Sequence, residues 1–517
     1  MPDILEANVP LSESLIWRLQ REFYQQRGLK VWTEDRIPEY ITNNPFIAEI
    51  YASIVYNFLS ECMKSGQKEE PPVSKDRPLR ILEMGAGHGK FCYLFLKRLM
   101  ALYPDAAVRY FLTDCSEALL DSWRSNPYLA EFVQSGVLEF ELLQAGATLA
   151  ESIRSKIFGS PLVVIASYIF DSLPQDAFII QDGKVLEALV TVKAKNGKDG
   201  APPQLSDLQL SYTNVGVSPR RYADESWNHI LEWYRAQLGS ASVLFPCSAL
   251  RMLQELGSLS NGNMLVLAAD KGFVYEEDLY FSQGQPSIEF HSSNCFSQMV
   301  NFDAIAKYFR GQGGKAFLPD KHIGTLNICG FLQCRPDVDF LKTQEVFRVL
   351  QEAFGPDDLF TLFAWLNPHM EQMSVPQILA ALRLTRWDPV AFVRLFPVLV
   401  RQFQTISTER QDLRNAVLRT WENHYPLNTA DNELAFQCGV VLLELRFFEE
   451  AMAMFRKSEQ IVSRSAATSY NMGLCAIGLG RTSEALAFMD EACKQDPNFE
   501  PARLSRARLE AELKNLH

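Results

Sequence analysis

The chain has 517 residues, more than one ordinary hydrophobic core accommodates, so two or three domains are expected. Hydrophobic residues make up 47 % of the chain and charged residues 22 %, which is the balance of a soluble globular protein. The formal net charge of −12 argues against non-specific binding to nucleic acid or to an anionic membrane, because both need a basic protein surface.

Three further features of the sequence bear on where the protein works. No apolar run approaches the roughly 18 residues of a membrane span. The ten cysteines are scattered and form no CxxC pair, which predicts reduced, mostly buried thiols rather than disulfides or a metal site. The first residues, MPDILEANVPLSE, carry acidic side chains where a targeting signal carries positive charge. A cytoplasmic location is therefore expected.

Apolar residues recur every three or four places between residues 45 and 62, which predicts a helix. Asn44 suits the N-cap of this helix and Pro45 its first position. The polar run at 64–78 then predicts a surface linker. We expect residues 1–78 to form an N-terminal helical arm and linker.

Short apolar runs separated by helical patterns begin at residue 79. Strands are predicted at LRIL (79–82), VRYFLTD (108–114), VLEFELL (137–143), PLVVIASYIF (161–170) and NMLVLAADKG (263–272). This alternation predicts an α/β domain with a mostly parallel, Rossmann-like sheet over residues 79–338. Within it we expect a flexible excursion at 193–204 and a helical segment at 224–258, part of an insertion at about 215–260.

From residue 339 to the end of the chain only helical patterns remain. Small residues repeat at an interval of 34: Gly439, Ala451 and Phe455 recur as Gly473, Ala485 and Met489. This resembles the tetratricopeptide repeat, in which glycine and alanine let paired helices approach closely, over about 432–511. The resemblance implies a surface that binds a protein or peptide partner, and self-association is the alternative.

A glycine cluster, EMGAGHGKF at 83–91, follows the first strand of this domain. A dinucleotide fingerprint would need glycine where Lys90 stands. A phosphate loop would need glycine in place of Met84 and Ser or Thr in place of Phe91. The pattern E-x-G-x-G-x-G instead resembles the first motif of class I methyltransferases, which implies S-adenosylmethionine as cofactor.

The residue types suit that cofactor. Glycines let the backbone turn sharply against a ligand, and the next helix directs its N–H groups toward the methionine carboxylate. Glu83 can face the positive amino or sulfonium end, and Asp114, at the end of the second strand, can bind the ribose hydroxyls. The alternative for Asp114 is an N-cap for the helix starting at Ser116. His88 is expected to be a loop side chain. The predicted cofactor residues of these turns are Glu83, Gly85, Ala86, Gly87, Gly89, Asp114, Cys115 and, near the adenine, Gln144.

Two other segments narrow the resemblance. SYIFDSLP (167–174) is similar to the NEFFDALP signature of MidA-like methyltransferases, whose mitochondrial member is an arginine methyltransferase, and YITNNP (40–45) to their YITAPE-like segment. The resemblance implies that Thr42 and Asn43 close over the cofactor and that Ser167 contacts it. Weaker likenesses lie at 270–272 and 300–303. Ser167 and Tyr168 replace the family's Asn and Glu, which puts arginine specificity in doubt.

Methyl transfer to a protein recruited by the helical repeats is the favoured function. Asp171 and Tyr168 are the candidate catalytic residues, as groups that could take a proton from the acceptor. The alternative for Asp171 is a cap for the turn ending at Pro174. A non-catalytic adaptor with a retained methyltransferase fold is the rival function. A nicotinamide oxidoreductase is disfavoured by Lys90.

Overall fold

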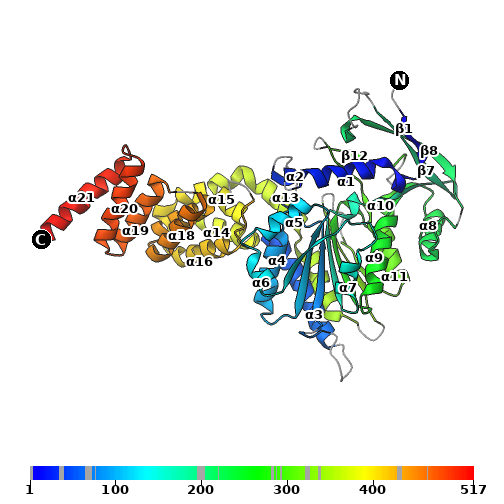
Figure 1. Ribbon diagram of the computed structural model, residues 1–517, viewed down its shortest axis with the longest axis horizontal. Helices are drawn as coiled ribbons and strands as arrows, with labels where there is room; N and C mark the ends of the chain where they lie inside the picture. The colour runs from blue at the N-terminus through cyan, green and yellow to red at the C-terminus, as the bar shows by residue number, and fades with distance from the viewer. Residues whose placement is uncertain are drawn as a thin grey trace. The chain divides into compact units, whose positions relative to one another are not determined.

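The computed structural model divides the chain into two compact units, one of residues 1–43 and 47–358 and one of residues 44–46 and 359–517 (Figure 1). The structure describes residues 4–28, 30–33, 40–64, 73–75, 77–194, 204–218, 220–280, 284–286, 288–291, 294–320, 326–335, 339–427, 433–462 and 464–516. Parts of the predicted linker at 64–78 and excursion at 193–204 lie outside these residues. Within them, no helix is long and apolar enough to cross a membrane.

A seven-stranded sheet forms the centre of the first unit, in the order β15-β16-β10-β5-β2-β3-β4. Its strands are β2 (Leu79–Met84), β3 (Val108–Asp114), β4 (Leu138–Leu142), β5 (Leu162–Ser167), β10 (Met264–Asp270), β15 (Lys315–Phe317) and β16 (Asn327–Gln333). The five strands from β4 to β10 are parallel, and β16 pairs antiparallel with both of its neighbours. The predicted mostly parallel sheet is confirmed.

Helices cover both faces of this sheet, which explains why its strands are apolar on both sides. They include α3 (Pro45–Lys64), α4 (Lys90–Leu102), α5 (Glu117–Arg124), α6 (Ala130–Gln134), α7 (Glu151–Ile157), α9 (Cys247–Leu259) and α11 (Phe302–Gly311). Figure 1 shows α4 and α6 on one side and α9 and α11 on the other. Leu82 and Val164 of the sheet pack in one core with Leu250 of α9 and Ile305 of α11.

A second, antiparallel sheet was not predicted. Its strands are β1 (Ile4–Val9), β6 (Asp176–Gln181), β7 (Lys184–Ala194), β8 (Leu208–Gly216) and β9 (Ser240–Phe245). The prediction of one helical segment over 224–258 is therefore wrong: β9 separates α8 (Glu225–Gln237) from α9. β9 pairs along its whole length with β6, so distant strand pairing overrides the local pattern. The predicted N-terminal helical arm likewise begins with a strand, because β1 pairs with β7.

Helix α1 (Leu15–Arg27) and the hairpin of β12 (Glu289–Phe290) and β13 (Phe296–Ser297) pack against this second sheet. Trp17 and Phe296 share its core with Val190, and their rings meet edge to face at 4.9 Å. The packing fixes α1 and the hairpin to each other although some 270 residues separate them. The short elements around them are η1 (Leu11–Glu13), α2 (Lys30–Thr33), η2 (Phe170–Ser172), η3 (Leu205–Asp207), β11 (Gly272–Phe273), α10 (Glu276–Tyr280) and β14 (Val300–Asn301).

Among the described residues after β16 only helices occur, as predicted. The first unit ends with α12 (Leu341–Ala353), and α13 (Pro356–Leu366) leads into the second. The second unit contains η4 (Asn367–Gln372), α14 (Val375–Leu384), α15 (Pro389–Val400), η5 (Phe403–Thr405), α16 (Arg410–Glu422), α17 (Leu434–Glu444), α18 (Phe448–Val462), α19 (Ala466–Gly478), α20 (Thr482–Gln495) and α21 (Glu500–Leu516).

Close helix contacts recur in this helical unit at the predicted interval. A Cβ at Gly439 of α17 would lie 2.7 Å from the Phe455 ring of α18. A Cβ at Gly473 of α19 would lie 2.6 Å from Met489 Cε of α20. Both pairs need glycine because the facing side chain fills the space of a Cβ.

Candidate functional site

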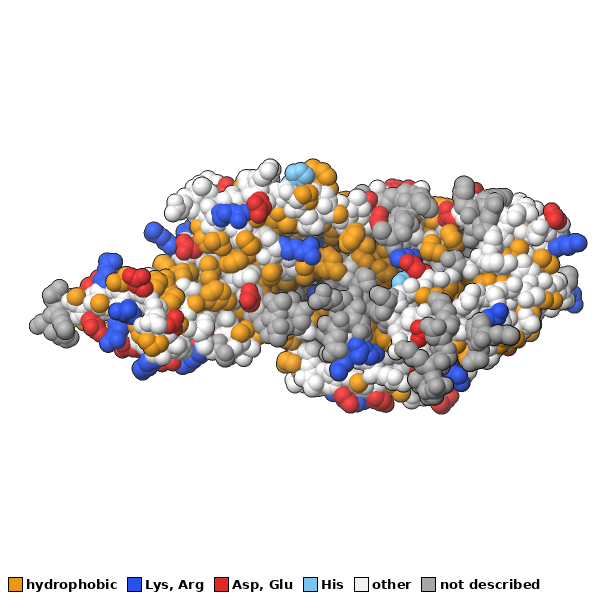
Figure 2. All heavy atoms as spheres, turned by 90° about the horizontal axis from the view of Figure 1, so that it is seen from above, with side chains coloured by type: hydrophobic (Ala, Val, Ile, Leu, Met, Phe, Trp, Pro, Cys, Tyr) orange, Lys and Arg blue, Asp and Glu red, His pale blue; other side chains and the backbone are white. Residues whose placement is uncertain are grey.

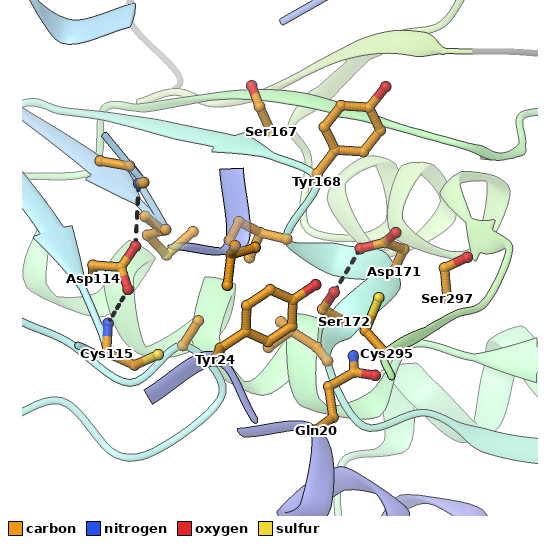
Figure 3. Close-up of a pocket in the computed structure, with 18 of the residues that line it drawn as sticks. Gln20, Tyr24, Asp114, Cys115, Ser167, Tyr168, Asp171, Ser172, Cys295 and Ser297 are labelled. Atoms are coloured by element: carbon orange, nitrogen blue, oxygen red, sulfur yellow. Dashed lines mark hydrogen bonds between the residues drawn. The ribbon is translucent and has the colours of Figure 1, made fainter. Parts of the chain in front are cut away.

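A cavity of about 610 Å³ opens at the carboxyl ends of the parallel strands. The segments that follow β2, β3, β4, β5 and β10 all line it, at the point where the strand order reverses between β2 and β5. In doubly wound α/β proteins this switch point is where ligands bind, and the volume is that of a small-molecule site. Figure 3 shows Asp114 and Cys115 at one end of the cavity and Asp171 and Ser297 at the other.

The glycine turn forms one wall. Gly85 and Gly87 line the cavity and have φ of 61° and 58°, which favours glycine. The Gly87 N–H donates to Asp114 Oδ2 (3.2 Å), and Trp123 Nε1 donates to the Gly87 carbonyl (2.9 Å). These bonds hold the turn against β3 and α5. Ala86 lies in the same wall, whereas Gly89 is the N-cap of α4, with φ of 81°, and does not line the cavity.

His88 is a structural side chain of this turn. Its Nδ1 accepts a hydrogen bond from the Lys90 N–H at the start of α4 (3.2 Å), and it is 4 % exposed. Burial, with a smaller contribution from the Lys90 charge, lowers the pKa of His88 to about 3. It is therefore a neutral acceptor at neutral pH, which suits a cap and not a base.

Glu83 reaches the cavity from the end of β2. Its Oε2 accepts a hydrogen bond from the Tyr110 hydroxyl (2.7 Å), and the side chain is 6 % exposed. Burial raises the pKa of Glu83 to about 8, although the Tyr110 bond works in the other direction. A nearby positive charge would favour its ionised form.

Asp114 joins the glycine turn to the end of β3. Its Oδ1 accepts from the Cys115 N–H (2.7 Å) and its Oδ2 from the Gly87 N–H. Burial raises the pKa of Asp114, and the two backbone N–H groups oppose that shift. α5 begins at Glu117 with no side-chain cap from Ser116, so Asp114 is not the N-cap side chain of this helix. The Ser116 N–H and the Cys115 thiol also favour the ionised form of Asp114.

Two buried carboxyl groups meet at the ends of β5 and β10. Asp270 is fully buried, and its Oδ2 accepts from the N–H groups of Ile169 (3.3 Å) and Phe170 (3.0 Å). Asp171 Oδ1 accepts from the Ser172 hydroxyl (3.0 Å). Burial raises the pKa of Asp270 well above its usual range and that of Asp171 to about 6. Burial therefore disfavours the charged form of both carboxyl groups.

The other predicted residues also line the cavity: Thr42, Asn43, Cys115, Gln144, Ser167 and Tyr168. Tyr168 has a φ of 54°, unusual for a bulky residue, and its ring points away from Tyr24 and Gln20 in Figure 3. Burial, with the charges of Asp270 and Asp171, raises its pKa. Tyr168 is thus a hydrogen-bond donor at neutral pH, which argues against its use as a base.

Sequence reasoning missed the wall formed by α1 and the hairpin β12–β13. Gln20, Arg21 and Tyr24 of α1 line the cavity, and so do Glu289, His291, Cys295, Phe296 and Ser297 of the hairpin. His291 Nε2 lies 2.9 Å from Ser297 Oγ. No motif surrounds these residues in the sequence. Only the pairing of α1 with the hairpin brings them to the site.

Residues 56–279 match a protein-family model described as "Putative S-adenosyl-L-methionine-dependent methyltransferase". This segment contains the strands from β2 to β10 and the turns that follow each of them. The match supports a methyltransferase domain. The family description names S-adenosylmethionine as the cofactor of this segment. No curated protein matches the chain.

Two solved structures from Burkholderia thailandensis resemble the chain weakly. One, bound to S-adenosyl-homocysteine, is 13 % identical with a TM-score of 0.42, over 64 % of this chain and 89 % of its own. The other, an uncharacterized protein of the same superfamily, is 13 % identical with a TM-score of 0.38, and the match covers 64 % of this chain and 88 % of that protein. The tetratricopeptide protein YrrB, described as having an unusual peptide-binding site, is 20 % identical with a TM-score of 0.24. That match covers 32 % of this chain and 82 % of YrrB.

The residues present suit this cofactor. Gly85 and Gly87 offer backbone without side chains, Asp114 brings a carboxylate that can accept from hydroxyl groups, and Glu83 can pair with an ammonium group by losing its proton. Glu83 and the glycine turn come from the end of β2 and Asp114 from the end of β3, and all three line one cavity.

Proposed function

We propose that the chain is a class I methyltransferase of the MidA-like kind that transfers a methyl group from S-adenosylmethionine to a protein. One observation carries the proposal: the glycine turn, Glu83 and Asp114 meet in one cavity at the switch point of the sheet, in the arrangement that the E-x-G-x-G-x-G motif implies. The MidA-like assignment rests on the segments 40–45 and 167–174, which both contribute to the same cavity.

In this mechanism the turn at Gly85–Gly87 holds the methionine part, Asp114 the ribose and Glu83 the ammonium group, with Gln144 near the base. When bound, S-adenosylmethionine supplies an electrophilic methyl group on its sulfonium. The chain's remaining task is to align a nucleophile behind that methyl group, a positioning effect worth roughly 7–11 kcal/mol in favourable cases. Asp171 lines the cavity beside the buried carboxyl group of Asp270, where it can attract a cationic acceptor or accept its proton.

The protein acceptor is proposed from the helical unit. Its regular helix pairs with glycine contacts at an interval of 34 residues favour tetratricopeptide-like repeats, which bind peptides or proteins. Figure 2 shows hydrophobic side chains gathered on one face of this unit. Its exposed hydrophobic residues include Phe360, Trp365, Val462, Ile477 and Leu504. These five residues are spread over α13, α18, α19 and α21; the apolar gathering that Figure 2 shows is typical of protein interaction sites.

Calorimetric titration with S-adenosylmethionine tests the cofactor site. The native chain should bind, and Asp114→Ala should lose about 1–3 kcal/mol, about 5- to 150-fold in affinity, because charged hydrogen bonds to the ribose disappear. Asp121→Ala is the matched control: Asp121 lies on the next helix, its side chain is 72 % exposed, and its loss should leave affinity unchanged. Equal affinity of the Asp114 and Asp121 variants would remove Asp114 from the site.

Transfer of a tritiated methyl group to the proteins of a cell extract tests the reaction. A methyltransferase should label at least one protein, and deleting the helical unit after α13, residues 367–517, should abolish that labelling while leaving cofactor affinity intact. The adaptor hypothesis also predicts tight cofactor binding by the full chain, but no labelled protein.

A further inference from the structure

The wall of α1 and the hairpin β12–β13 contains a hydrogen-bonding group that lacks a partner. Gln20 is 2 % exposed and lines the cavity. Its Oε1 accepts from the Phe296 N–H (2.9 Å), which fixes the orientation of the amide. Its Nε2 then has no hydrogen-bond partner among the residues that the structure describes. A buried donor without a partner is unfavourable, so this amide can donate to an oxygen that a ligand brings.

The same wall holds an imidazole paired with a hydroxyl. His291 and Ser297 face each other across the hairpin, with Nε2 and Oγ 2.9 Å apart, and both line the cavity. β13 also contacts η2, the turn that carries Asp171. Figure 3 places Ser297 beside Asp171, far from Asp114. The pair therefore lies at the end of the cavity opposite the predicted ribose site.

The wall is held rigidly, as positioning requires. Phe296 is anchored on one side by its hydrogen bond to Gln20 and on the other by its ring contact with Trp17, in the core of the second sheet. Tyr24, one helical turn after Gln20, completes the wall; burial holds the pKa of Tyr24 well above its usual range, so it stays a neutral donor. The other charged or titratable groups lining the cavity near this wall are Arg21, Lys271, Glu289 and Cys295.

We propose that α1 and the hairpin β12–β13 form the acceptor subsite, in which Gln20 binds an oxygen of the acceptor and His291, through Ser297, takes its proton. The acceptor is of a definite class: an amine or hydroxyl nucleophile that arrives protonated, next to a carbonyl or carboxylate oxygen. This inference rests on the proposed methyl transfer.

The proton and electron balance of the step is simple. The acceptor nitrogen or oxygen forms a bond to the methyl carbon while the bond from that carbon to the sulfonium breaks, its electron pair going to sulfur. The acceptor's N–H or O–H bond breaks as well: Ser297 Oγ takes this proton and passes its own to His291 Nε2. S-adenosylhomocysteine leaves uncharged at sulfur, and the new imidazolium lies in a cavity that the carboxyl groups of Asp171 and Glu289 also line.

The two roles predict different kinetic changes. With tritiated S-adenosylmethionine and a cell extract as acceptor pool, His291→Ala should lower the maximal rate 10²- to 10⁴-fold at unchanged half-saturating extract concentration. Added imidazole should restore part of that rate. Gln20→Met should instead raise the half-saturating concentration about 5- to 150-fold, because it removes a buried hydrogen bond to the acceptor. Calorimetry should give native S-adenosylmethionine affinity for both variants.

His229→Ala is the control, since His229 is exposed on α8, outside the cavity. It should keep the native rate and show no response to imidazole. His291→Ala with the native rate, or with a loss that imidazole does not relieve, would overturn the role of His291. An unchanged half-saturating concentration in Gln20→Met would overturn the role of Gln20. If the native chain labels nothing, the proposed function itself fails, and this inference fails with it.

Discussion

Glu83 gives the sharpest test of how the site binds its cofactor, through a change of pH. Burial raises its pKa to about 8, so about nine-tenths of the molecules carry it protonated at pH 7. If Glu83 pairs with the cofactor's ammonium group, binding must ionise it and release that proton. Affinity then rises with pH until the pH passes the pKa of the free site. Between pH 6 and 7 the ionised fraction grows about ninefold, or about 1.3 kcal/mol, and affinity should grow equally.

Calorimetry of S-adenosylmethionine binding at pH 6 and 7, in buffers with different heats of ionisation, measures both affinity and proton release. About 0.9 proton per site should be released at pH 7. Glu83→Gln is the matched variant, because its amide oxygen can still accept the hydrogen bond of Tyr110. Its affinity should be lower and change by less than about twofold over the same range. Parallel pH dependence of the native chain and the variant would refute the role of Glu83.

Three further substitutions test the supports of the site and of the helical unit. Gly85→Ala would put a Cβ 2.2 Å from Ile169 Cδ1. Gly136 has a similar φ but open space around it, so Gly136→Ala is the control. In urea unfolding, Gly85→Ala should destabilise the first unit by about 1–3 kcal/mol more than Gly136→Ala does. Trp123→Phe removes the hydrogen-bond donor to the Gly87 carbonyl. It should lower the free energy of unfolding by about 1–3 kcal/mol and weaken S-adenosylmethionine binding. Unchanged binding would show that the turn keeps its shape without this hydrogen bond. The new methyl group of Gly439→Ala would meet the Phe455 ring, whereas that of Gly473→Ala would meet the flexible end of Met489. Hydrogen exchange should therefore speed up more in α17 of the first variant than in α19 of the second. Equal effects would contradict that packing.

The parallel sheet and its turns could be predicted because their signals are local. Near-continuous apolar runs mark β2, β3 and β5, and the glycine spacing after β2 separates one nucleotide-binding pattern from another. Asp114 was found by its position at a strand end, which the register of β2 and β3 then brings beside the glycine turn.

The rest of the site depends on contacts between distant residues. Gln20 and Phe296 are 276 positions apart, and nothing near either one indicates the other. β9 has an apolar run that suits a strand or a helix equally, and only its pairing with β6 decides. Asp270 stands near the end of a predicted strand; its complete burial beside Asp171, which raises its pKa, is not revealed by a single sequence.

A crystal structure of the chain with S-adenosylhomocysteine tests the central claim most directly. We expect ribose hydroxyls within hydrogen-bond distance of Asp114, the amino-acid part against the turn at Gly85–Gly87, and the sulfur facing the wall of Gln20 and His291. Density for the ligand elsewhere on the chain, or a cavity that excludes it at saturating concentration, would contradict the account.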